Sequence, residues 1–161
     1  MISDLCSQAP VERNAGFVVG TNIINADYKF IKVLDEAYKS FLLGLYHSTV
    51  LLCSITAERL CYDILEKSKI KIDDIVLDNK QMKAMFKIPY STLVELVRST
   101  NLISQQTASN MMKLNEIRQS YIHPTMGRDA YKDAKDSINL LCQIIDSSLD
   151  YYVKREIRRK L

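Results

Sequence analysis

Apolar residues recur at three- and four-residue steps along most of the chain, which is the spacing of one face of an α-helix. No segment alternates polar and apolar residues for long enough to predict a strand. The pattern therefore predicts an all-α protein, an antiparallel bundle of about five helices. We expect these helices near residues 27–43, 45–67, 92–101, 105–122 and 129–161.

The remaining segments define the domain. Residues 1–26 have no helical periodicity, and we expect an extended leader ahead of a single helical domain at 27–161. The stretch 68–90 indicates a long connection with one short helix near 79–86. The segment 40–57 carries no Asp, Glu, Lys or Arg, but it holds glycine, histidine and five Ser or Thr residues. We interpret it as part of a buried central helix and expect no membrane span.

Three local signals predict helix ends. Thr92 followed by Glu95 fits a capping box, in which hydroxyl and carboxylate satisfy backbone N–H groups at a helix start. Ser104 can accept a hydrogen bond in the same way for the next helix. Pro124 disfavours the α conformation at His123, so we expect that helix to end there.

Amino-acid composition excludes few classes of protein. The chain is 47% hydrophobic and 25% charged, as is usual for a globular protein, and its net charge of +3 does not by itself indicate a nucleic-acid partner. The run 154–160 carries five cations and one anion. Two interpretations remain, a patch that contacts phosphate and a solvated helix end whose cations suit the helix dipole, and we favour the second.

The four cysteines form no C-x-x-C pair and no cluster with histidine, so we expect no metal site. Cys53 and Cys61 lie eight residues apart on one predicted helix, about 12 Å along its axis. That distance is too long for a disulfide, and we expect two buried thiols in a reducing, cytoplasmic compartment. No phosphate-binding glycine loop is present, and we expect no cofactor.

Histidine chemistry is limited to His47 and His123. We interpret His47 as an ordinary residue of the second helix, whose imidazole is either satisfied by hydrogen bonds or partly exposed. His123 follows Arg118 by five residues, and Asn115 and Arg118 lie at the border of an apolar stripe, where polar groups need partners. On spacing alone, the favoured interpretation is an arginine paired with an acid and a histidine that ends a helix.

Placement adds to this interpretation. The element Arg118-Gln119-Ser120-Tyr121-Ile122-His123 has the form R-x4-H, stands at a predicted helix end and is followed by proline and a long last helix. Upstream, the stretch from Gly44 to Leu60 resembles a break between two helices with a glutamate, Glu58, in the second. In these features residues 27–153 resemble the HEPN superfamily, the higher-eukaryote and prokaryote nucleotide-binding domains.

The resemblance implies a helical domain that dimerises. In its catalytic members, Arg and His from both protomers meet in one cleft and cut RNA without metal. Carried over by position, Arg118 and His123 are the catalytic candidates. The supporting candidates are Glu58, Asn115, Gln119 and Tyr121. Two roles for Glu58 remain open: it orients Arg118 across the core, or it forms an ion pair with no catalytic part, which we favour.

The implied partners are a second copy of the chain, RNA, and an antitoxin or regulatory protein, with stress or phage defence as the setting. Two positions depart from the family pattern. Gln119 stands where members often have Asn or Asp, and Thr125 stands where one toxin subset has Tyr. The alternatives are a non-catalytic HEPN-type module that binds RNA, nucleotide or a partner protein, and a plain helical interaction domain.

Overall fold

The computed structural model describes residues 30–68, 71–72, 75–76, 87–123 and 127–160. The leader expected at 1–26 and the short helix expected near 79–86 lie outside the described residues. The elements are α3 (Phe30–Leu42), α4 (Tyr46–Ser68), β1 (Lys71–Ile72), β2 (Ile75–Val76), α6 (Tyr90–Ser99), α7 (Gln105–Ile122) and α8 (Ala130–Lys160).

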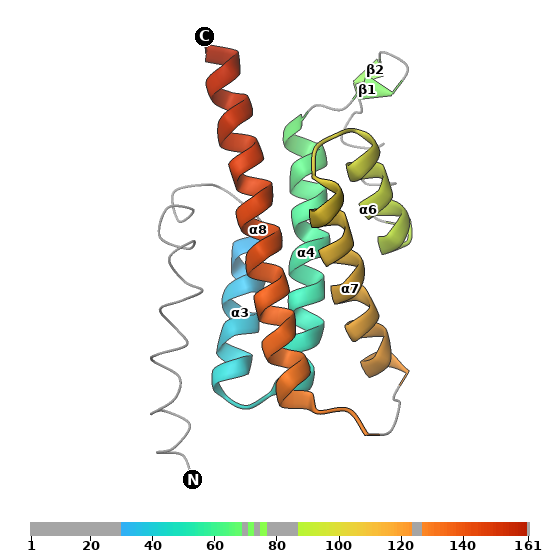
Figure 1. Cartoon of the computed structure of the whole chain (residues 1–161), viewed down its shortest axis with the longest axis vertical. Coiled ribbons are helices and arrows are strands. Elements are labelled where there is room, and N and C mark those ends of the chain that lie inside the picture. The colour runs from blue at the N-terminus through green and yellow to red at the C-terminus, as the bar shows by residue number, and fades with distance from the viewer. Residues whose placement is uncertain (1–29, 69–70, 73–74, 77–86, 124–126, 161) are drawn as a thin grey trace.

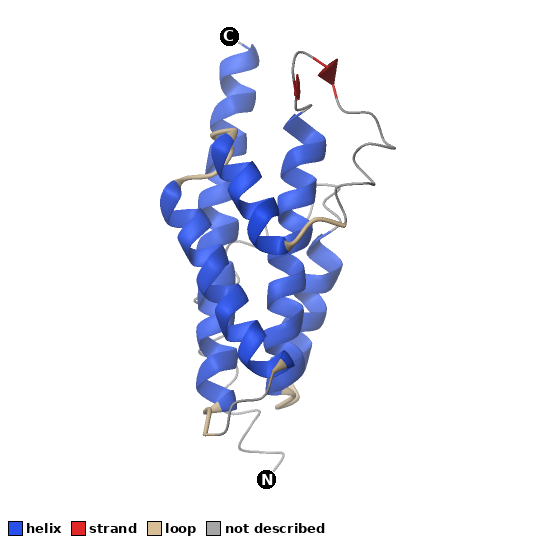
Figure 2. Ribbon diagram, turned by 90° about the vertical axis from the view of Figure 1, so that its right-hand side faces the viewer, coloured by secondary structure: helices blue, strands red, loops and turns tan. Residues whose placement is uncertain are grey.

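The described part of the chain is a bundle of five helices, which confirms the predicted all-α fold (Figure 1). The long helices run along one common axis, as the view turned by 90° also shows (Figure 2). Only β1 and β2 are strands in that part, and they form one short antiparallel hairpin with Lys71 opposite Val76.

The α4 helix is the centre of the bundle, because it packs against α3, α6, α7 and α8. Its buried stripe includes Cys53, Ala57 and Ile64, all with no exposed surface. This confirms the prediction that the second helix is central and packs against the last one. None of the described helices is both long and apolar enough to span a membrane.

Glycine ends the first helix. Gly44 has φ +75°, a left-handed conformation that costs glycine less than other residues. There the Leu45 N–H donates to the Ser40 carbonyl at 2.9 Å and the Gly44 N–H donates to the Phe41 carbonyl at 3.0 Å. These two bonds satisfy carbonyls at the end of α3 and turn the chain directly into α4.

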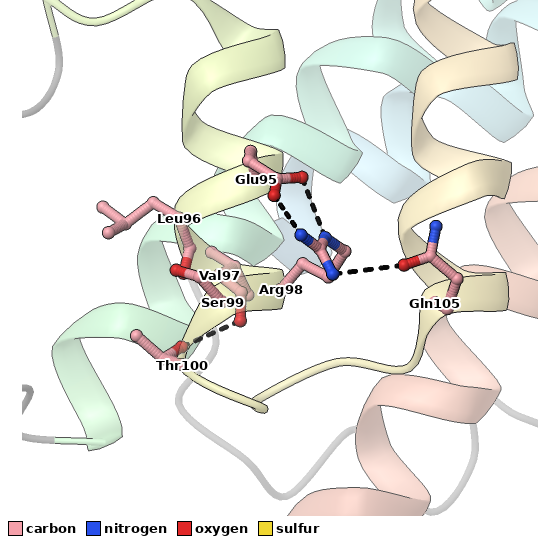
Figure 3. A network of polar contacts seen from close by, with 7 residues as sticks. All are labelled: Glu95, Leu96, Val97, Arg98, Ser99, Thr100 and Gln105. Atoms are coloured by element: carbon pink, nitrogen blue, oxygen red, sulfur yellow. Dashed lines mark hydrogen bonds and ion pairs between the residues drawn. The ribbon is translucent and has the colours of Figure 1, made fainter.

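The predicted capping box at Thr92 is wrong. The α6 helix already begins at Tyr90, with Pro89 as its N-cap and no capping side chain, because proline has the φ of a helix start and no N–H to satisfy. Glu95 is instead paired with the Arg98 guanidinium, which also donates to Gln105 Oε1 of α7 at 3.3 Å (Figure 3).

Both predicted ends of α7 are confirmed. Ser104 Oγ accepts a hydrogen bond from the Thr107 N–H at 3.0 Å, and His123 leaves the helix with φ −116° and ψ 84°. Cys53 and Cys61 are buried and unlinked, as predicted. The α8 backbone stays helical to Lys160 and projects beyond the other helices at the top of Figure 1. The phosphate contact considered for residues 154–160 stays a hypothesis.

Candidate functional site

Arg118 is paired with Glu58 across two helices. Arg118 Nη1 of α7 lies 3.8 Å from Glu58 Oε2 of α4, and the side chains are 25% and 31% exposed. The pair thus lies at the edge of the core, where the sequence placed Arg118. Since charge-assisted N–H···O bonds are about 2.7–2.9 Å long, this separation is an ion pair without a hydrogen bond. The guanidinium therefore keeps N–H donors for another acceptor, such as a phosphate oxygen.

Two further residues, Asn115 of α7 and Tyr90 of α6, each carry a buried polar side-chain atom. Asn115 Oδ1 and Tyr90 Oη have no hydrogen-bond partner in the described part of the chain. The pKa of Tyr90 is raised well above its usual value, first by burial and also by the negative charge of the Glu58 carboxylate, while the Arg118 guanidinium lowers it. Tyr90 therefore lies within the electrostatic reach of both members of the ion pair. Nothing in its sequence context marked it, because only the packing of α6 on α4 and α7 brings it here.

His123 lies exposed where α7 ends. Its backbone N–H donates to the Gln119 carbonyl at 2.9 Å, while the Gln119 side chain is exposed. Within the described residues, no hydrogen bond or ion pair joins Arg118 to His123. The two candidates lie near the same end of one helix, five residues apart.

Tyr121 lies in a different set of contacts. Its hydroxyl donates to Asp133 Oδ2 at 2.8 Å, and the Arg128 guanidinium binds both oxygens of the same carboxylate, at 2.6 and 2.8 Å. The His47 ring meets the Tyr121 ring edge-on with centroids 5.0 Å apart. We call these four residues, His47, Tyr121, Arg128 and Asp133, the Asp133 cluster. It joins the start of α4, the end of α7 and the start of α8.

Electrostatics fix the protonation states of Asp133 and Tyr121 at neutral pH. The Arg128 hydrogen bonds, helped by Tyr121, lower the pKa of Asp133 despite partial burial. Burial and the hydrogen bond to Asp133 raise the pKa of Tyr121 to about 12. Asp133 is therefore an anion and Tyr121 a neutral donor throughout the physiological range. The sequence named Tyr121 as a candidate and His47 as an ordinary helix residue, but it did not indicate Arg128 or Asp133.

An open cavity of about 390 Å³ lies beside the Asp133 cluster. It is lined by Ile117, Arg128, Asp129, Lys132, Asp133 and Asp136. Its charged side chains are mixed in sign, and Arg128 is already bound to Asp133. In the described ranges, no three His, Cys, Asp or Glu residues gather so as to hold a metal ion.

Comparison of the chain with models of known protein families, with curated proteins and with solved structures finds no match. The function is therefore inferred from the fold and from the side chains at the end of α7.

Proposed function

We propose that the chain is a metal-independent endoribonuclease of the HEPN type, in which Arg118 and His123 act on the RNA phosphate. The observation that carries the proposal is the presence of two suitable groups near the same end of α7. Arg118 is partly exposed and loosely paired, and His123 is exposed at the helix end. Both groups are accessible to a phosphodiester, and both are of the types that its cleavage needs.

The proposed chemistry needs no group beyond protein and RNA. A histidine takes the proton of a ribose 2′-hydroxyl, whose oxygen attacks the neighbouring phosphorus. The bond from phosphorus to the 5′-oxygen breaks, and that oxygen takes a proton from a second acid. Arg118 binds the non-bridging oxygens and stabilises the charge that develops on them. The products are a 2′,3′-cyclic phosphate and a free 5′-hydroxyl.

A homodimer would supply the second proton-transfer group, His123 of a second copy. The apolar surface next to the site supports this part of the proposal. Ile122 at the end of α7 is 45% exposed and Ile55 on α4 is 40% exposed, on the same two helices that carry Arg118 and Glu58. In the proposed cytoplasmic setting of stress or phage defence, an antitoxin or regulatory protein would act by covering this surface.

A second candidate function is a non-catalytic module that binds RNA, nucleotide or a partner protein. The Glu58 carboxylate favours the form that binds a partner protein, because a neighbouring anion opposes the approach of phosphate to Arg118. In this version the arginine and the histidine contribute to binding and no bond is broken.

Incubation with single-stranded RNA in EDTA separates the two. The nuclease proposal expects cleavage that falls roughly a hundred-fold or more in His123→Ala and by a comparable factor in Arg118→Ala. Arg98→Ala is the matched control, since it removes a surface arginine of α6 and should cleave like the wild type. Cleavage that depends on added metal, or survives His123→Ala unchanged, contradicts the proposal. RNA binding without cleavage selects the binding module.

A further inference from the structure

We propose that Asp133 and Tyr121 are positioning residues that hold His123 in place, an inference that rests on the proposed function of His123. The Asp133 cluster ties the last turn of α7 to the first turn of α8, and His123 follows Tyr121 by two residues. Neither Asp133 nor Tyr121 needs to touch RNA for this role. Their effect is to limit where the imidazole can lie.

Three hydrogen bonds from two side chains converge on one shielded carboxylate. The Asp133 side chain is 12% exposed. It accepts two parallel hydrogen bonds from Arg128 and one from Tyr121, all between 2.6 and 2.8 Å. Bidentate arginine–carboxylate pairs fix direction as well as distance. The Tyr121 hydroxyl is therefore held at a defined point on α8.

Within the described residues, Tyr121 is the last side chain of α7 with a hydrogen bond or ring contact to another helix. The Ser120 hydroxyl bonds to the Ile117 carbonyl of its own helix. Gln119, Ile122 and His123 are exposed. Helix ends fray where tertiary contacts are few. Without the Tyr121 contacts, no hydrogen bond or ring contact in the described residues would join the last turn of α7 to another helix.

The backbone of Asp133 is held in place by the first turn of α8. It lies in the first turn of α8, where the helix dipole favours an anion, and its N–H donates to the Asp129 carbonyl at 2.9 Å. The next residue, Ala134, has no exposed surface. On the opposite side, the His47 ring contacts the Tyr121 ring and restricts its movement. The Asp133 cluster thus connects the end of α7 to both α4 and α8.

A loss of His123 positioning changes kcat and KM in a way that a loss of overall stability does not. A histidine with a looser position binds the same substrate but reaches the reactive geometry less often, so kcat falls while KM stays unchanged. Tyr121→Phe removes only the hydroxyl and keeps the ring against His47. Asp133→Asn keeps the shape of the carboxylate and removes the charge that holds Arg128.

The test compares the full-length wild type, Tyr121→Phe, Asp133→Asn and the matched control Glu95→Gln. The control disrupts a similar arginine–carboxylate pair on α6, away from the end of α7. NMR amide exchange of His123, whose N–H donates to Gln119, reports the opening of the last turn. We expect this exchange to accelerate about tenfold in the two cluster variants, with the Leu114 amide unchanged, and to stay as in the wild type in Glu95→Gln.

The second readout is RNA cleavage in EDTA, where we expect kcat to fall about tenfold in Tyr121→Phe with KM unchanged. If the wild type cleaves nothing, the nuclease proposal fails while amide exchange still decides whether the Asp133 cluster holds His123. Unchanged exchange of the His123 amide in both variants overturns the positioning inference. An unchanged kcat in an active enzyme, together with faster exchange of the His123 amide, also overturns the inference. In that case, a less firmly held His123 would not slow catalysis.

Discussion

The substitution Glu58→Gln tests how Arg118 is used. Arg118 Nη1 and Glu58 Oε2 lie 3.8 Å apart, and the two side chains are 25% and 31% exposed. Two unit charges at about 4 Å attract by about 1 kcal/mol in water and about 4 kcal/mol at an effective dielectric constant of about 20. Partial desolvation and the ordering of two long side chains offset most of that attraction.

We therefore expect Glu58→Gln to lower the free energy of unfolding by only about 0.5–1 kcal/mol. For a chain of this size that corresponds to a fall in Tm of about 2–4 °C at most. The released guanidinium should also bind phosphate more readily. The Kd for a single-stranded RNA oligonucleotide should fall by about two- to fivefold, which is the same free energy expressed as affinity.

The assay is urea unfolding combined with RNA titration at fixed salt, in a His123→Ala background that keeps the RNA intact. Asp35→Asn is the control, since it removes an exposed carboxylate of α3 that is paired with Lys39 and should alter neither quantity. A loss of about 3 kcal/mol or more, together with weaker RNA binding, would refute the reasoning. It would show that the pair is a buried structural element whose arginine is not available to a ligand.

Three further outcomes are expected. Ser104→Ala should lower the free energy of unfolding by about 1 kcal/mol, because the hydroxyl caps α7. Thr92→Ala should be close to neutral, because Thr92 lies inside α6. Equal losses of stability for the two variants in urea unfolding would contradict this assignment of the caps. Burial raises the thiol pKa of Cys53 and Cys61, so a thiol reagent should label both only as fast as the chain unfolds, and rapid native labelling would contradict their burial. The pKa of Asp133 is lowered in the folded state, so the stability that its carboxylate contributes is present above the unfolded pKa of about 3.9 and is lost as pH falls through the lower folded pKa. Thermal melts below about pH 4 should show this loss of stability. In Asp133→Asn, this pH dependence of Tm should be weaker.

The helices could be predicted from the sequence because helical periodicity is a local property. The apolar stripe of α4 and the caps at Ser104 and His123 depend on residues within a few positions of each other. The start of α6 was misjudged because two local signals compete there. Pro89 satisfies the geometry of a helix start before Thr92 is reached, and Glu95 then pairs with Arg98.

The site could be predicted only in part, because its contacts cross between helices. The border position of Arg118 on an apolar stripe indicated an acidic partner, and Glu58 is that partner. No local pattern could indicate that Asp133 receives both Arg128 and Tyr121, since that depends on how the end of α7 meets the start of α8. The contact of His47 with Tyr121 likewise exists only because the start of α4 and the end of α7 lie at the same level of the bundle.

The most direct test of the proposed function is the cleavage of an RNA oligonucleotide in EDTA, compared with the same oligonucleotide carrying 2′-deoxyribose at the nucleotide 5′ to the cut. If the 2′-hydroxyl is the attacking group and His123 transfers its proton, the all-ribose substrate yields a 2′,3′-cyclic phosphate end, and the deoxy substitution abolishes cleavage at that position. Mass spectrometry of the products reads both results. Cleavage at the deoxy position, or products that carry a 5′-phosphate, would contradict the mechanism proposed for Arg118 and His123.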